Sequence, residues 1–412
     1  MKKIIVSAAV AAMALSTSAF ALEDVKTTGQ MKVYYETNNG GTNDIFNKNG
    51  ASAEVVFKVG FTGKQGDVGF GATVYQTSTM GLEGKIVSGA RSGTANGAPF
   101  VGEAYITAPI APSTTLKFGK QELDTPLAFT ERWNAVPNTF NAAVAINSSI
   151  DNVTLIAAYV GQGSASNNMS PMVPKNFGTN NIDGNVADQY FGGATAIAAL
   201  YANDGLAVNF WAYHIENVLA PANGTIGGVS VNAAWIDGSA KVGPATVKAY
   251  AALVTNDGTA SKDTSAFALS AAGKVGGVKL FAAASMVSSG DLPVANTATS
   301  FKKTKLPTAA VYLDGRYVGQ PETMAFKLKA SGKIGSTGLA LQGVMNDGTA
   351  SNDANENLDA TEIDFIITQK VGVFNLKGIL MHRDWANENG LGTQYSNKGA
   401  QQHVRIIASV NF

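Results

Sequence analysis

Apolar and polar residues alternate along most of this chain. At the C-terminus one face of the pattern holds Val404, Ile406, Ala408, Val410 and Phe412, and the residues between them fall on the other face. The same alternation recurs at residues 32–36, 54–61, 245–253 and 326–329. A period of two is typical of a β-strand, because successive side chains point to opposite faces. The pattern therefore predicts an all-β chain.

Counting the alternating segments predicts about eighteen strands, with sixteen as the alternative. The expected strand starts are Val25, Ala51, Val68, Phe100, Thr114, Ala142, Val153, Gln189, Leu206, Val229, Ala245, Asp263, Gly277, Pro321, Gly338, Ala360, Val373 and Gln401.

Two kinds of connection separate these strands. Short links carry glycine beside lysine, as in Gly63–Gly66 and Gly332–Gly335, and predict tight hairpin turns. Long links, such as residues 162–188 and 346–359, are rich in Asn, Gly, Ser, Thr and Asp. Residues 308–319 also alternate, but an additional spanning strand there would give an odd number. We therefore expect residues 308–319 to form part of a long folded loop.

The N-terminus has the three parts of a secretory signal peptide. Lys2 and Lys3 precede the apolar run Ile4–Leu15, and Ala19-Phe20-Ala21 provides a small-x-small cleavage site. Residues 1–21 are thus expected to be removed after Ala21. Residues 22–412 would then form one exported domain.

Composition excludes several classes of protein. The chain has 412 residues, of which only 15% are charged, so it has ample apolar surface to bury and is not a disordered polyelectrolyte. The 30 basic and 30 acidic residues balance, which argues against binding to nucleic acid. The absence of cysteine excludes disulfides and cysteine-ligated metals.

An exported chain of strands about ten residues long, with long loops at one end, is typical of an outer-membrane barrel. The bilayer requires closure, since an open edge would leave backbone groups unpaired in hydrocarbon. About eighteen strands enclose a lumen too wide for side chains to fill. The sequence therefore predicts a transmembrane antiparallel β-barrel with long extracellular loops and short periplasmic turns, in contact with outer-membrane lipid and lipopolysaccharide.

The chain resembles a known family in two places. Its last strand, which ends on Phe412, looks like the assembly signal of bacterial outer-membrane porins. The stretch Leu116–Leu127, followed by Arg132, resembles the inward-folded third loop of OprD-like porins and of the major outer-membrane porins of epsilonproteobacteria. Glu131-Arg132-Trp133 departs from the acidic-arginine pair usual in that loop. The resemblance implies a passive channel, monomeric or trimeric, that is narrowed by this loop and inserted by the barrel-assembly machinery.

Charged residues near positions 121–140 are the candidate constriction. We expect Glu122, Asp124, Glu131 and Arg132 to lie in the lumen. The alternation along each predicted strand places a set of basic residues on the face that points into the lumen, and Arg383 is a further candidate. The set is Lys32, Lys58, Lys117, Lys248, Lys327, Lys329 and Arg405. Opposed charge across a narrow passage sets ion preference. The alternative interpretation is that each of these residues is simply a solvated lumen side chain.

Signals for other chemistry are weak. The three histidines, His214, His382 and His403, lack the spacing of metal ligands, and we expect neither an enzyme nor a cofactor. The motif Asn-Asp-Gly-Thr-Ala-Ser occurs at 256–261 and 346–351, where turn chemistry is favoured over calcium binding. The predicted function is a water-filled porin for ions and small hydrophilic solutes. The alternative is an adhesion or receptor surface made by the long loops. An uptake channel for hydrophobic compounds would need an apolar lumen, contrary to the lysines.

Overall fold

The computed structural model describes residues 22–40, 43–90, 99–163, 175–176, 193–218, 229–258, 261–299, 301–349, 358–385 and 400–412. The signal peptide predicted at residues 1–21 lies outside this part of the chain. Within it, no helix has the length and apolar character needed to span a membrane. Its helices are the short 3-10 turns η2 (Lys48–Gly50) and η3 (Thr297–Thr299).

The described chain is dominated by β-strands, most of them 10 to 16 residues long. The strands are β1 (Glu23–Asn38), β2 (Ala51–Gln65), β3 (Val68–Ser78), β4 (Phe100–Ala111), β5 (Thr114–Gln121), β6 (Phe140–Ile150), β7 (Val153–Gly163), β8 (Lys175–Asn176), β9 (Gly193–Ala202), β10 (Leu206–Val218), β11 (Val229–Val242), β12 (Ala245–Asn256), β13 (Thr264–Val275), β14 (Val278–Val287), β15 (Thr323–Ile334), β16 (Thr337–Gly348), β17 (Ala360–Val371), β18 (Phe374–Trp385) and β19 (Gln401–Asn411).

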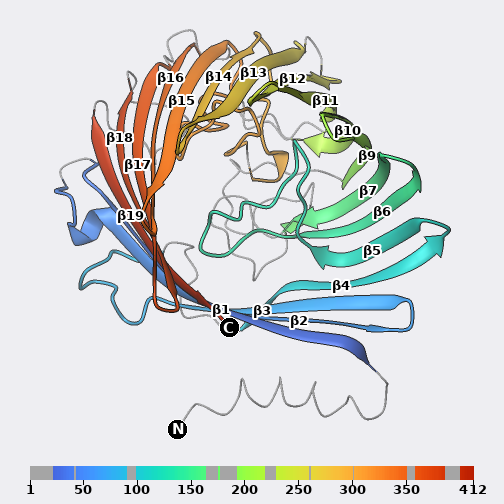
Figure 1. The fold of residues 1–412 in the computed structure, drawn as a ribbon, viewed down its shortest axis with the longest axis horizontal. Coiled ribbons are helices and arrows are strands. Elements are labelled where there is room, and N and C mark those ends of the chain that lie inside the picture. The colour runs from blue at the N-terminus through green and yellow to red at the C-terminus, as the bar shows by residue number, and fades with distance from the viewer. Residues whose placement is uncertain are drawn as a thin grey trace.

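The strands close into a single antiparallel barrel. Each long strand pairs with its neighbours in chain order, and β1 pairs with both β2 and β19 (Figure 1). The two-residue strand β8 pairs only with β7 and is not part of the ring, which therefore has 18 strands. The predicted closed barrel and its strand number are confirmed.

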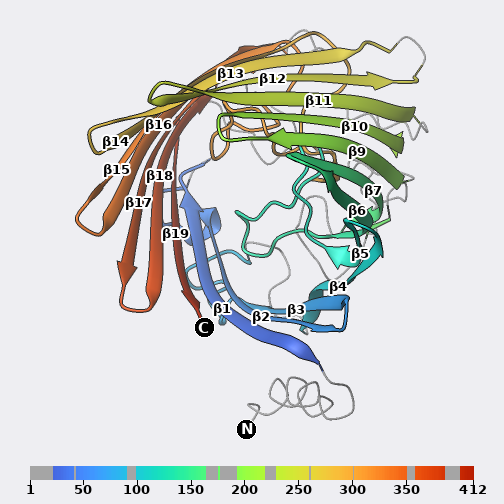
Figure 2. The ribbon, with the colours of Figure 1, turned by 45° about the vertical axis from the view of Figure 1, so that its right-hand side comes forward.

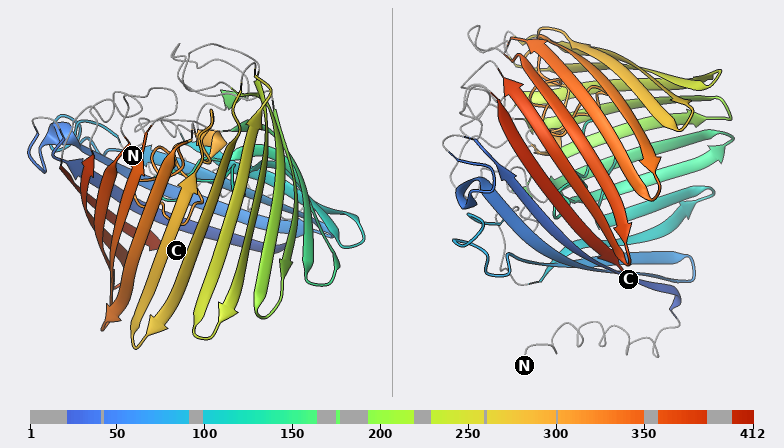
Figure 3. Two further views of the ribbon diagram at one scale, coloured as in Figure 1. Left: turned by 90° about the horizontal axis from the view of Figure 1, so that it is seen from above. Right: turned by 60° about the vertical axis from the view of Figure 1, so that its left-hand side comes forward.

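Connection length differs between the two ends of the barrel, as predicted. At one end, turns of a few residues join β2 to β3, β11 to β12 and β15 to β16 (Figure 3, left). Gly66, Gly243 and Gly335 open these turns with φ of 56°, 58° and 58°, a left-handed conformation that glycine adopts without strain. Both chain ends of the barrel, Glu23 and Asn411, lie on this side.

Each strand shows two faces. In β13, Phe267 and Leu269 are 56% and 61% exposed, whereas the alternate residues Ala266, Ala268 and Ser270 are buried. The exposed positions point outward and are mainly apolar, and the inward positions carry most of the charges. This is the polarity of a wall that faces lipid on one side and a lumen on the other.

The core of the molecule lies inside the ring. Two long loops fold inward, the β5–β6 loop (residues 122–139) and the β14–β15 loop (residues 288–322), as Figures 1 and 2 show. The second of these contains residues 308–319, which are not a strand, in agreement with the prediction. Its apolar residues Leu292, Val294 and Leu306 pack with the inner faces of neighbouring strands, in a cluster that includes Trp235. At its other end, Leu313 packs with Trp385 of β18.

Candidate functional site

The two inward loops are joined by hydrogen bonds across the lumen. The side chain of Asn296 accepts from the backbone N–H of Phe129 at 3.1 Å and donates to the Phe129 carbonyl at 2.9 Å. Beside it, both the backbone N–H and the hydroxyl of Thr297 donate to the Leu127 carbonyl, at 2.9 and 2.8 Å. The Asn296 side chain thus pairs with both the backbone N–H and the carbonyl of Phe129, as a neighbouring strand would do. The two loops form one structural unit.

Glu131 lies within this junction. Its side chain is 1% exposed and accepts a hydrogen bond from the Thr299 hydroxyl at 2.5 Å. Its backbone N–H donates to Asn138 at 2.7 Å. From the sequence we expect Glu131 to bring its charge into the lumen. In the structure Glu131 is buried between the loops, where its carboxylate is an anchor.

The other three charged residues of the predicted constriction lie close together. Arg132 donates through Nε to Glu122 at 2.5 Å and lies 3.8 Å from Asp124, and Lys305 of the β14–β15 loop donates to Asp124 at 2.5 Å. The Arg132 and Asp124 side chains are each 56% exposed, so they contact water. The hydrogen bond to Glu122 raises the pKa of Arg132, which therefore stays charged.

The far end of the β5–β6 loop reaches another part of the wall, at β1 and β19. Lys32 on β1 donates to the carbonyls of Asn134 and Ala135, both at 3.3 Å. The Trp133 ring lies 5.7 Å from the Arg405 guanidinium on β19 and 4.6 Å from Lys303. The loop therefore extends across the lumen from its origin at β5 and β6 to β1 and β19 (Figure 2).

The carboxylate of Glu362 binds one turn of the β14–β15 loop to the wall. Glu362 on the inner face of β17 accepts from the backbone N–H groups of Val311, Tyr312 and Leu313, at 2.8, 3.0 and 2.7 Å. Glu362 is 1% exposed. Three hydrogen bonds to one carboxylate satisfy a turn that would otherwise leave buried N–H groups unpaired.

Tyr312 carries this loop to a basic cluster on β18 and β19. Arg405 donates to Glu36 of β1 at 2.6 Å and to the Tyr312 hydroxyl at 3.1 Å. The Arg383 guanidinium lies 3.9 Å from the centre of the Tyr312 ring. Tyr312 also donates to Glu36. Arg405 is 3% exposed and its charge is balanced by Glu36, so its guanidinium is not free in the lumen.

The predicted lysines lie on inward faces of their strands, each in a different setting. Lys327 donates to the Ala309 carbonyl of the β14–β15 loop. Lys117 lies 3.8 Å from the Tyr105 ring centre and Lys58 lies 5.5 Å from that of Tyr75. None of the six predicted lysines has an ion pair with a carboxylate in the described part of the chain. Lys32 and Lys327 bond to loop carbonyls, and the other four are Lys58, Lys117, Lys248 and Lys329.

Sequence reasoning missed the partners that organise the site. Asn296, Lys305, Tyr312 and Glu362 make the contacts described above, and no motif marks them. Asn296 lies 167 residues from Phe129, and Glu362 lies 50 residues from Tyr312. The only signal was the expectation of a folded loop at residues 308–319.

No metal site is formed by the part of the chain that the structure describes, since no three His, Asp or Glu side chains converge there. Most of the second calcium candidate, residues 350–357, lies outside the described residues.

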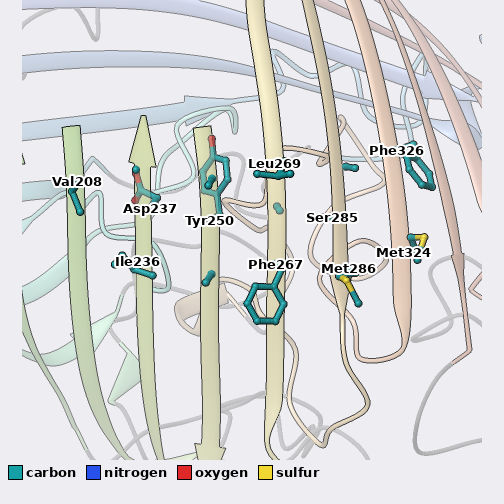
Figure 4. A pocket seen from close by; sticks show the side chains of 15 residues that line it. Val208, Ile236, Asp237, Tyr250, Phe267, Leu269, Ser285, Met286, Met324 and Phe326 are labelled. Carbon is teal, nitrogen blue, oxygen red and sulfur yellow. The ribbon is translucent and has the colours of Figure 1, made fainter. Parts of the chain in front are cut away.

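A hollow of about 700 Å³ lies on the outer surface between β10 and β15 (Figure 4). Alanine and glycine form its floor, and exposed apolar side chains form its rim. The rim includes Val208, Ile236, Phe267, Leu269, Met286 and Phe326. These are outward positions, so the hollow belongs to the apolar outer belt and not to the lumen.

The fold has clear relatives among solved structures. OccK3 (OpdO) of Pseudomonas aeruginosa superposes with a TM-score of 0.70 at 14% identity, covering 94% of this chain and 96% of that one. OccAB1 of Acinetobacter baumannii gives 0.70 at 15% identity, with 95% and 97% covered. The outer membrane protein OpdK of P. aeruginosa gives 0.67 at 13% identity, with 94% and 99% covered.

At these identities the likeness concerns the fold. The resemblance to OprD-like porins is confirmed at that level. No protein-family model matches the chain, and a search of curated protein sequences found no significant match.

Proposed function

We propose that this chain forms a water-filled channel in a bacterial outer membrane, through which ions and small hydrophilic solutes diffuse passively. The observation that carries the proposal is the two-faced wall, a closed ring of 18 strands with an apolar exterior and a charged interior. The likeness to OpdK, described as an outer membrane protein, supports the same location. The proposal includes no catalytic step.

The joined loops would form the constriction. Asp124, Glu122 and Arg132 lie at the water-exposed part of the β5–β6 loop, and unpaired lysines such as Lys58 and Lys329 lie on the wall. Charges of opposite sign across a narrow passage create a transverse field, which orients dipolar solutes and sets ion preference. Arg405 and Glu131 would contribute by holding the loops in place, since both are buried.

We also infer the partners that such a barrel needs. The apolar exterior fits outer-membrane lipid and lipopolysaccharide. The last strand, ending on Phe412, would be recognised by the barrel-assembly machinery. A homotrimer remains a proposal that chemical cross-linking in native membranes tests.

The deciding experiment is single-channel recording of the refolded protein in planar bilayers. We expect stable conductance steps that increase with the salt concentration, because ions would cross a hydrated lumen. Heat-modifiable migration on a denaturing gel verifies folding in the same preparation. A folded barrel that gives no conductance would contradict the channel and favour the adhesion or receptor surface.

A further inference from the structure

A second hollow, of about 320 Å³, lies inside the barrel between the β5–β6 loop and the wall. Inward side chains of β6, β7, β9 and β10 form its floor, and the start of the loop forms its rim. The floor includes Val144, Ile156, Ala196, Trp211 and Ile215.

This floor is unusual for a wall that borders water. The lumen of a channel is ordinarily polar, and the inward lysines predict a polar lumen here as well. On β7, however, the inward positions Ile156, Ala158 and Val160 are all apolar. Leu200 of β9 and Trp211 of β10 lie beside them on the same inner surface. Such a surface gains free energy when an apolar group replaces water. For scale, an engineered cavity of about 150 Å³ lined by apolar side chains binds benzene.

The rim carries charges that are already compensated. Glu122 pairs with Arg132, and Asp124 pairs with Lys305, both at 2.5 Å. Lys117 lies against the Tyr105 ring. A charged ligand of either sign would meet two carboxylates that each already pair with a basic residue, and Lys117 already lies against a ring, so such a ligand would gain little net attraction. The chemistry of the hollow therefore favours a neutral ligand with an apolar body.

We propose that this luminal hollow is a binding site for small neutral solutes that have a compact ring or branched alkyl body and one polar group. The body would lie on the floor beside Trp211, and the polar group would face the loop at Thr125. The inference rests on the proposed channel function, to which it adds a class of solute retained during passage. This hollow would make one side of the lumen apolar, and the side that carries the lysines would stay hydrated.

The test uses 4-bromobenzyl alcohol as the probe, with myo-inositol as a polar ring of similar size. Bromine quenches tryptophan fluorescence on contact, so a saturable quench reports binding without any conduction. Ala196→Phe fills the hollow. Ala207→Phe is the matched control, because Ala207 is also inward on the neighbouring strand β10 but does not line the hollow. Trp211→Phe removes the reporter.

We expect saturable quenching in the wild type and in Ala207→Phe, an affinity at least about tenfold weaker in Ala196→Phe, and loss of the saturable component in Trp211→Phe. The probe should also lower single-channel conductance in the first two proteins, and inositol should not. Equal quenching in Ala196→Phe and the control would overturn the site even if the channel conducts. Saturable quenching in a folded barrel without conductance would support the site and refute the channel.

Discussion

Asp124 and Glu131 lie in the same loop and carry the same charge, yet only Asp124 contacts water. The Asp124 side chain is 56% exposed, whereas Glu131 is 1% exposed and bonded to Thr299. In the proposed channel the exposed carboxylate would act on permeating ions. The buried carboxylate acts on the loop junction.

We therefore predict different effects for two single substitutions. Asp124→Asn leaves the Lys305 charge uncompensated, so the reversal potential under a salt gradient should shift toward anion preference. Glu131→Gln should leave the reversal potential unchanged but lower the free energy of unfolding by about 1–2 kcal/mol, because its amide group would face the Asn296 and Asn134 amide donors. Each variant is the control for the other. Equal shifts in reversal potential would contradict this division of roles.

The position of a residue in the alternating pattern predicts whether its side chain points inward or outward. It does not predict which residues that side chain contacts. Lys32, Lys327 and Arg405 lie on the inward faces that the period-two pattern predicts. The partners could not be predicted, because they come from distant segments. Glu131 meets Thr299 across 168 residues of sequence, and this contact decides that Glu131 is buried. The sequence therefore predicts the side-chain directions in the barrel wall better than it predicts the contacts of the inward loops.

Among the elements, strand boundaries are determined by the local sequence pattern, whereas the course of the inward loops is determined by tertiary contacts. Predicted starts at Val25 and Pro321 lie two residues from the observed Glu23 and Thr323, because alternation and turn glycines are local signals. The start predicted at Gln189 differs more, since β9 begins at Gly193. The inward course of the β14–β15 loop depends instead on contacts with distant strands, including those of Glu362, Lys327 and Arg405, which no local signal marks.

This dependence gives a prediction for Glu362→Gln. The substitution removes the charge that three backbone N–H groups share, and hydrogen bonds to charged groups contribute about 1.5–3 kcal/mol. The β14–β15 loop should then leave the wall more often, and single-channel recordings should show more frequent current fluctuations. The matched control is Asp237→Asn, an inward carboxylate on β11 that accepts a hydrogen bond from Asn209 at 2.9 Å. More fluctuations in both variants, to the same extent, would contradict a specific anchoring role.

For the whole molecule, closure depends on one seam between the ends of the chain. β1 and β19 pair from Gln30 with Asn411 to Asn38 with His403. At the end of this seam the backbones of Gly29 and Phe412 exchange two hydrogen bonds, at 2.6 and 2.9 Å. Without such pairing a barrel would present open edges to lipid.

The Phe412 side chain completes the seam on the outer surface. Its ring lies over Gly29, where a Cβ would come within 2.0 Å of a ring carbon, and it stacks on Phe57 of β2 at 6.0 Å. An aromatic ring over a strand glycine replaces the side-chain contact that the glycine lacks. The ring therefore connects the last strand to the first two.

Phe412→Ala should consequently weaken closure more than loss of an ordinary outward ring. Aromatic pairs contribute about 0.5–1.5 kcal/mol beyond burial, so the variant should lose its folded, heat-modifiable band at a lower temperature and refold into vesicles in lower yield. Phe118→Ala is the control, because Phe118 is an outward ring, 57% exposed, on β5 and therefore away from the seam. If both variants melt together, the ring of Phe412 has no special part in closure, and backbone pairing of β1 with β19 is sufficient.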